Sequence, residues 1–239
     1  ALTEKFIEKR FHDLHLYLNG ETGFGEAATR PVREVIAERF ATILTHHYKD
    51  SICLIAHSMG SIIAYDMLYH HRHLPPIDLL ITIGSPLAQP TLMAKLTDIN
   101  PVFSKIKTPD GIKRWYNLSD LHDLVAVNYN LSDDFEPNAA GVHPIDLIVK
   151  NSYQWEGEPN PHNVFGYLQT PELAHLVWEF LTAGRGKWKI YWGQQYAKLQ
   201  ERLFHHTEKM WLAAPIRPEA VLPKKRDPKI DDFHLQTRN

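Results

Sequence analysis

The chain contains too little cysteine for a disulfide framework. Its 239 residues include one cysteine, Cys53, so no disulfide can form within a single chain. Cys53 lies inside an apolar segment, and we interpret it as a buried, inert thiol. This cysteine usage fits a reducing compartment, and we expect a cytoplasmic protein.

Neither sign of charge is in excess, and long apolar runs are missing. The chain has 26 Lys and Arg against 28 Asp and Glu, a net charge of −2. This balance gives no electrostatic case for nucleic acid as a partner. No run approaches the roughly 18 apolar residues of a membrane-spanning helix, and the first six residues lack the zones of a secretory signal. We expect no nucleic-acid partner and no transmembrane segment.

Motifs for metals and phosphates are missing as well. None of the 15 histidines has the helical two-histidine-plus-glutamate spacing of a zinc hydrolase. The glycine-bearing segment 20–25 lacks the preceding strand and the final Lys-Ser/Thr of a phosphate-binding loop. We predict no metal and no cofactor.

The most informative stretch that is present is residues 51–60, SICLIAHSMG. A short apolar run ends at Ser58, with the small residues Ala56 and Gly60 two positions away on either side. A helical pattern follows. A strand, a strained turn at a serine and a helix make a nucleophile elbow, in which strand and helix pass too close for larger flanking side chains. The pattern predicts Ser58 as a nucleophile.

Strand and helix patterns alternate along the rest of the chain. After the elbow strand, apolar runs predict strands at 79–83, 114–118 and 145–149, and helical spacing predicts helices near 7–18, 32–44, 62–68, 91–97 and 171–181. Such alternation predicts an α/β fold with a mostly parallel sheet flanked by helices. We expect this core to span residues 1–185.

Two further segments follow the predicted core. Residues 186–212 predict a helix with an aromatic stripe over 188–203, and residues 213–239 predict a proline-rich extended tail. The stripe either packs on its own domain or forms a surface for a second copy of the chain or for lipid.

A serine nucleophile needs a histidine base, and that base needs a carboxylate to fix its tautomer. In a parallel sheet these groups should lie in loops after later strands, in the order Ser, Asp, His. After the third strand we prefer Asp123 as the acid, because an apolar pair follows it; Asp120, closer to the strand, is the alternative acid. After the fourth strand His162 is the predicted base. We interpret His57, beside the nucleophile, as a packing or supporting group.

These residues resemble the α/β-hydrolase superfamily, in particular its lipase and serine-esterase branch. The elbow Ala-His-Ser-Met-Gly, the Gly-Ser-Pro at 84–86 and the Asp-x-Val turn at 123–125 carry the resemblance, which extends over about residues 32–181. It implies Ser58 as nucleophile, Asp123 as acid, His162 as base and the Met59 amide as one oxyanion donor. In place of the first elbow glycine this chain has Ala56.

The resemblance also implies strands that the chain does not contain. A second oxyanion amide usually follows an earlier strand, roughly 60 or more residues before the elbow serine, and only 57 residues precede Ser58. We expect that N-terminal strands are missing from this chain. The alternatives are that the loop 19–25 supplies the second donor or that this donor is absent.

The sequence therefore predicts a serine esterase or lipase-like hydrolase that forms an acyl-enzyme on Ser58. The expected substrate is a small-molecule or lipid ester. An acyltransferase with the same triad and a non-catalytic hydrolase-fold binding protein remain the alternatives.

Overall fold

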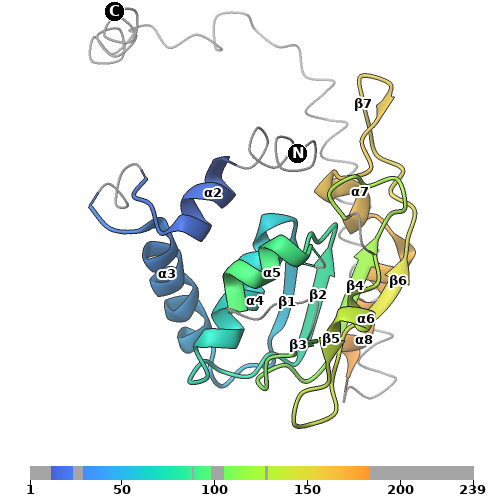
Figure 1. The fold of residues 1–239 in the computed structure, drawn as a ribbon. Coiled ribbons are helices and arrows are strands. Elements are labelled where there is room, and N and C mark those ends of the chain that lie inside the picture. Colours follow the sequence, from blue (N-terminus) through green and yellow to red (C-terminus); the bar gives the residue numbers. More distant parts are fainter. Residues whose placement is uncertain (1–11, 24–28, 88, 98–104, 127–128, 184–239) are drawn as a thin grey trace, which may run out of the picture. The chain divides into compact units, whose positions relative to one another are not determined.

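The computed structural model describes residues 12–23, 29–87, 89–97, 105–126 and 129–183 (Figure 1). The chain divides into two compact units, Ala1–Ala183 and Gly184–Asn239. The second unit lies outside the described residues, and with it the predicted helix 186–212, its aromatic stripe at 188–203 and the tail 213–239. All described residues belong to the first unit.

A four-stranded parallel sheet forms the centre of this unit. It contains β1 (Cys53–His57), β2 (Leu79–Ile83), β4 (Trp115–Ser119) and β6 (Ile145–Ile148), in the order β1-β2-β4-β6. Every residue of β2 is buried, as expected of a strand covered on both faces. The predicted α/β fold with a mostly parallel sheet flanked by helices is confirmed. Within the described residues β1 is an edge strand, and its Ile55 is half-exposed.

Helices pack on both faces of the sheet and create two apolar cores. One core lies under α2 (His12–Asn19), α3 (Val32–His46), α4 (Met59–His70) and α5 (Pro90–Thr97) and includes Tyr65, Trp115 and Phe135. The other lies under α7 (Val164–Leu168) and α8 (Pro171–Thr182). Figure 1 shows α4 and α8 on opposite sides of the strands. Because α4 begins directly at Ser58, the packing of this helix fixes the position of the elbow.

A buried carboxylate ties α4 to the two preceding helices. Asp66 on α4 is fully buried, accepts a hydrogen bond of 2.5 Å from the Tyr17 hydroxyl, and forms a two-point ion pair with the Arg33 guanidinium, whose Nε lies 2.8 Å from Oδ2. Burial, followed by the Asp66 charge, raises the pKa of Tyr17 well above its ordinary value, so the phenol remains a donor. This cluster anchors the helix that carries the elbow.

Sequence patterns did not predict several short elements. The structure adds a parallel pair of β3 (Ile106–Lys107) with β5 (Phe135–Glu136), a hairpin of β7 (Gln154–Trp155) with β8 (Glu158–Pro159), and the short helices α6 (Leu131–Asp134) and α7. Strands of two residues are too short to show an alternating pattern. None of the described helices has the length and apolar character needed to cross a membrane.

Candidate active site

Ser58 lies in the turn between β1 and α4, in a strained backbone conformation. Its φ is 52° and its ψ is −124°, a region that costs a non-glycine residue about 1–3 kcal/mol. Three contacts hold the turn: the Ser58 amide donates to the Ile83 carbonyl at 3.2 Å, and the Ser61 hydroxyl donates to the Ser58 carbonyl at 2.6 Å and contacts the Ser85 hydroxyl at 2.8 Å. The surrounding structure thus imposes the strain at Ser58, which is itself buried.

The structure brings Ser58, His162 and Asp123 together in one hydrogen-bonded chain. His162 Nε2 lies 2.9 Å from Ser58 Oγ, and His162 Nδ1 lies 2.9 Å and 3.0 Å from the two carboxylate oxygens of Asp123. Because the carboxylate can only accept from Nδ1–H, Nε2 is left free to accept the serine proton. Ser58 follows β1 directly, Asp123 lies in the loop after β4, and His162 lies beyond the β7–β8 hairpin that follows β6. The parallel register aligns the carboxyl ends of β1, β4 and β6 at the same edge of the sheet.

Asp123 is buried, yet its surroundings favour the charged carboxylate. Burial would raise the pKa of Asp123, but hydrogen bonds from His162, the Val125 amide and the Tyr167 hydroxyl hold this pKa below its ordinary value. The hydroxyl of Tyr167 lies 2.8 Å from Oδ2 of Asp123 and accepts the Asp120 amide at 3.0 Å. Burial and the nearby Asp123 charge raise the pKa of Tyr167, so this hydroxyl keeps its proton for Asp123.

Asp120, the alternative predicted acid, contacts Asn151 and His122 rather than His162. Its carboxylate accepts the Asn151 amide at 2.6 Å and the His122 amide at 2.7 Å, and its Oδ1 lies 3.1 Å from His122 Nδ1. These contacts join the loop after β4 to the loop after β6. Asp120 therefore organises two loops, while Asp123 contacts His162.

Two side chains other than Ser58 and Asp123 hold the loop that carries His162. The Asn151 side-chain amide donates at 2.8 Å to the carbonyls of both Pro161 and Asn163. The carbonyl between them, that of His162, accepts from His57 Nε2 at 2.9 Å. Three consecutive carbonyl oxygens are thus bound by two side chains.

Two glycines leave the space that these contacts need. A Cβ on Gly84, whose φ is +55°, would lie 2.9 Å from Asp123 Oδ2 and 3.2 Å from His162 Nδ1. A Cβ on Gly166 would lie only 1.6 Å from Asn151 Oδ1. Both positions therefore require glycine for close packing, and Gly84 also requires it for its backbone conformation.

Met59 is the first residue of α4, so its amide belongs to the N–H groups that have no partner within a helix. It follows the nucleophile directly, where an oxyanion donor of an elbow would lie. The loop 19–25 is described only as far as residue 23, so the part of it that includes Phe24 and Gly25 lies outside the described residues. The origin of a second donor stays a prediction.

Sequence reasoning missed Asn151, Tyr167, Gly84 and Gly166 as parts of this site. The Gly-Ser-Pro at 84–86 shows only where a strand ends, and the side chains that surround Gly84 come from residues 39 to 83 positions further along the chain. Asn151 follows the fourth strand directly, which is a position where site residues are expected. That position was the one signal available from the sequence.

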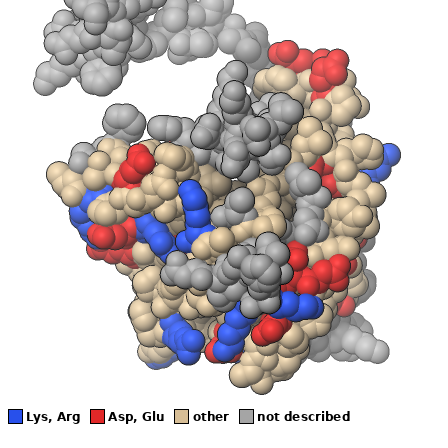
Figure 2. Space-filling view, in the orientation of Figure 1, with Lys and Arg blue, Asp and Glu red and all other residues tan. Residues whose placement is uncertain are grey.

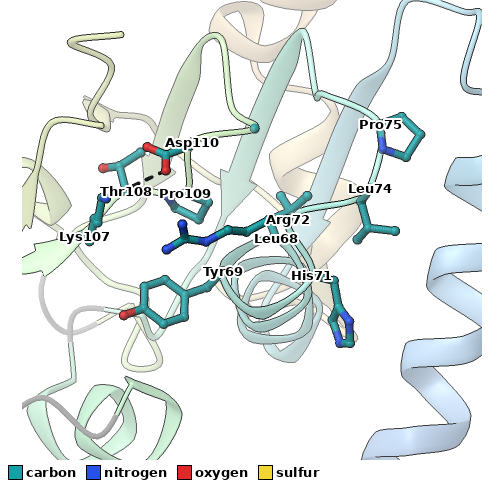
Figure 3. A pocket seen from close by; sticks show the side chains of 11 residues that line it. Leu68, Tyr69, His71, Arg72, Leu74, Pro75, Lys107, Thr108, Pro109 and Asp110 are labelled. Atoms are coloured by element: carbon teal, nitrogen blue, oxygen red, sulfur yellow. Dashed lines mark ion pairs between the residues drawn. The ribbon is translucent and has the colours of Figure 1, made fainter. Parts of the chain in front are cut away.

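The cavity drawn in Figure 3 lies at the far end of α4 from Ser58. It measures about 70 Å³ and includes Arg72, Lys107 and Thr108 in its lining, with an ion pair of 3.7 Å between Lys107 and Asp110. The Thr108 hydroxyl has no hydrogen-bond partner but is closed to solvent.

Figure 2 shows acidic and basic side chains interspersed on the face that carries α3. Among the described residues, no His, Cys, Asp and Glu side chains gather in a group that could hold a metal ion.

Comparison with known proteins agrees with this geometry at the level of the fold. Residues 29–128 match the family model described as the PGAP1-like alpha/beta domain, which is a member of the α/β-hydrolase superfamily. The match includes Ser58 and Asp123 and ends before His162. No curated protein and no solved structure matches the chain. This match fits the predicted resemblance to the α/β-hydrolase superfamily and to its lipase and esterase branch.

Proposed function

We propose that this α/β-hydrolase-fold protein is a serine hydrolase that cleaves a carboxylic ester through an acyl-enzyme on Ser58. The observation that carries the proposal is the chain of hydrogen bonds from Ser58 Oγ through His162 to Asp123, at 2.9 Å for each link. A serine in a strained turn, within reach of a histidine whose other nitrogen faces a carboxylate, is the arrangement that activates a hydroxyl as a nucleophile.

The proposed reaction has two halves. In the first, Ser58 Oγ forms a bond to the ester carbonyl carbon while its proton moves to His162 Nε2; the alcohol then leaves with that proton, and the acyl group stays on Ser58. In the second, water gives a proton to His162 Nε2 and attacks the acyl carbon, and Ser58 Oγ takes the proton back as the acid leaves. Asp123 stabilises the imidazolium in both halves. The Met59 amide is the proposed donor to the oxyanion.

The surroundings of the triad favour an ester with an apolar acyl group. Leu121 and Leu124, in the loop that carries Asp123, are 58% and 74% exposed, and Phe165, three residues after His162, is 59% exposed. Exposed apolar side chains close in sequence to Asp123 and His162 offer contact area for an acyl chain. We therefore place small-molecule esters with an aliphatic acyl group, or lipid esters, first among the proposed substrates.

A fluorophosphonate probe tests the nucleophile directly, because it reacts only with an activated serine. We expect the full chain to be labelled once, with the adduct on Ser58, and we expect Ser58→Ala to abolish both labelling and hydrolysis of p-nitrophenyl butyrate. Ser51→Ala serves as the matched control, since this exposed serine precedes β1 and lies outside the turn that carries Ser58. Labelling that persists in Ser58→Ala would overturn the proposal.

The same experiment separates the alternatives. A folded chain that is never labelled would indicate a non-catalytic hydrolase-fold binding protein. A chain that is labelled, but releases its acyl group to an added alcohol much faster than to water, would indicate an acyltransferase with the same triad.

A further inference from the structure

His57 contacts His162, the proposed base, in two ways: through a ring nitrogen and through a ring face. Its Nε2 donates to the His162 carbonyl at 2.9 Å, and its ring packs on the His162 imidazole with the centroids 4.7 Å apart and the planes tilted by 35°. Since a carbonyl can only accept, His57 Nε2 must carry a proton. One side chain thus fixes both the backbone and one ring face of the same residue.

This contact completes the support of the loop after β6. The Asn151 side chain binds the carbonyls of Pro161 and Asn163. His57 binds the carbonyl between them, that of His162. His57 is the last residue of β1 and pairs with Ile83 in the sheet, so its backbone is rigid. The loop is therefore fastened to the strand that carries the nucleophile.

We propose that His57 is a positioning residue for the base: it keeps His162 Nε2 in line with Ser58 Oγ by binding the His162 carbonyl and covering its ring. This proposal rests on the proposed serine hydrolase function. It also explains why a histidine precedes the elbow serine: from this position an imidazole both spans the distance to the loop and presents a flat face to the base.

The charges around His57 determine how it responds to pH. The titratable groups that face it are His162, Asp123 and Tyr167. Burial, and then the neighbouring His162, lower the pKa of His57 below its ordinary value. His57 therefore stays neutral at neutral pH, and a second cation 4.7 Å away is avoided when His162 takes the serine proton.

Two variants separate the hydrogen bond from the ring contact. His57→Gln retains an amide N–H at nearly the position of Nε2 but loses the ring and the titration. His57→Phe retains the ring but loses the donor. The measurements are kcat and KM for p-nitrophenyl butyrate, the rate of fluorophosphonate labelling, and the pH profile of kcat/KM.

We expect His57→Phe to lower kcat and the labelling rate by about 10- to 100-fold, because a small displacement of a reacting group has an effect of that size. KM should change little, and His57→Gln should recover most of the lost kcat. In both variants the acid limb of kcat/KM should show one titrating group, whereas the wild-type limb should steepen at low pH, where His57 is also protonated.

Two outcomes overturn the proposal. One is wild-type kcat and labelling in His57→Phe; the other is an equal loss in both variants with an unchanged acid limb, which would indicate a role in folding alone. A wild-type chain that is not labelled at all would instead contradict the proposed function, so the two failures are distinguishable.

Discussion

Replacing Gly84 by alanine should damage the triad far more than it damages the fold. Gly84 follows β2 and has a φ of +55°, so an alanine there is strained by about 1–2 kcal/mol. The added Cβ would also lie 2.9 Å from Asp123 Oδ2, where optimal contacts lie at about 3.5 Å. Asp123 would have to move by about half an ångström, and His162 with it.

The expected loss follows from that displacement. A misplacement of about 1 Å can reduce turnover by about 10²-fold, so we expect Gly84→Ala to lower kcat by about 10- to 100-fold. The free energy of unfolding, measured in urea, should fall by about 1–2 kcal/mol from the backbone strain. Both quantities can be measured on one preparation, with p-nitrophenyl butyrate as substrate.

Gly141 provides a matched control. Its φ is +77°, yet a Cβ there would meet no atom within 4 Å. Gly141→Ala should therefore lose a similar free energy of unfolding while kcat stays at the wild-type value. Full activity in Gly84→Ala, or an equal loss of activity in Gly141→Ala, would contradict this prediction. Either result would mean that the space left by Gly84 does not position Asp123 and His162.

Four further outcomes are expected. Asp123→Asn should lower kcat by about 10³- to 10⁴-fold by reversing the tautomer of the base, whereas Asp120→Asn should mainly lower the free energy of unfolding; a larger kcat loss in Asp120→Asn would reverse the assignment of the acid. Tyr167→Phe should lower kcat and raise the pKa of Asp123, because the carboxylate loses a hydrogen bond; an NMR titration of the Asp123 carboxyl carbon measures this pKa, and an unchanged value would contradict the prediction. Asp66→Asn should lower the free energy of unfolding by about 3 kcal/mol, because the partly buried Arg33 guanidinium loses its carboxylate partner. A wild-type melting temperature in this variant would contradict the prediction. The pKa of His57 is lowered in the folded state. The wild-type chain should therefore lose stability relative to His57→Gln as pH falls below about 6.5. Melting temperatures that change equally in the two chains from pH 8 to 5 would contradict this.

The sheet and the elbow could be predicted because their signals are local. The run Leu79–Ile83 is continuously apolar, and the structure buries it entirely. Ser58 lies between an apolar strand and a helix, with Ala56 and Gly60 where only small side chains fit. The chain order of acid and base follows from parallel strands whose carboxyl ends meet at one edge. Each of these inferences uses neighbouring residues or the topology of the sheet.

The supporting contacts could not be predicted, because they join loops that are distant in sequence. Tyr167 bonds to Asp123 across 44 residues, and His57 bonds to His162 across 105. The choice between Asp120 and Asp123 also depends on such contacts. Both carboxylates lie in the same turn, and only the positions of Asn151 and His162 decide which one faces the base.

The strain at Ser58 and the contacts around His162 have a common cause. A serine held at a φ of 52° can relax by peptide rotation unless the structure on both sides of the turn is rigid. The buried Asp66 cluster anchors α4 on one side, and β1 pairs in full with β2 on the other. His57 extends that rigid strand to the base loop. Ser58 follows β1 directly, and the last residue of β1 binds the His162 carbonyl. The proposed nucleophile and the proposed base are thus both attached to the same five-residue strand, which supports the 2.9 Å contact between Ser58 Oγ and His162 Nε2.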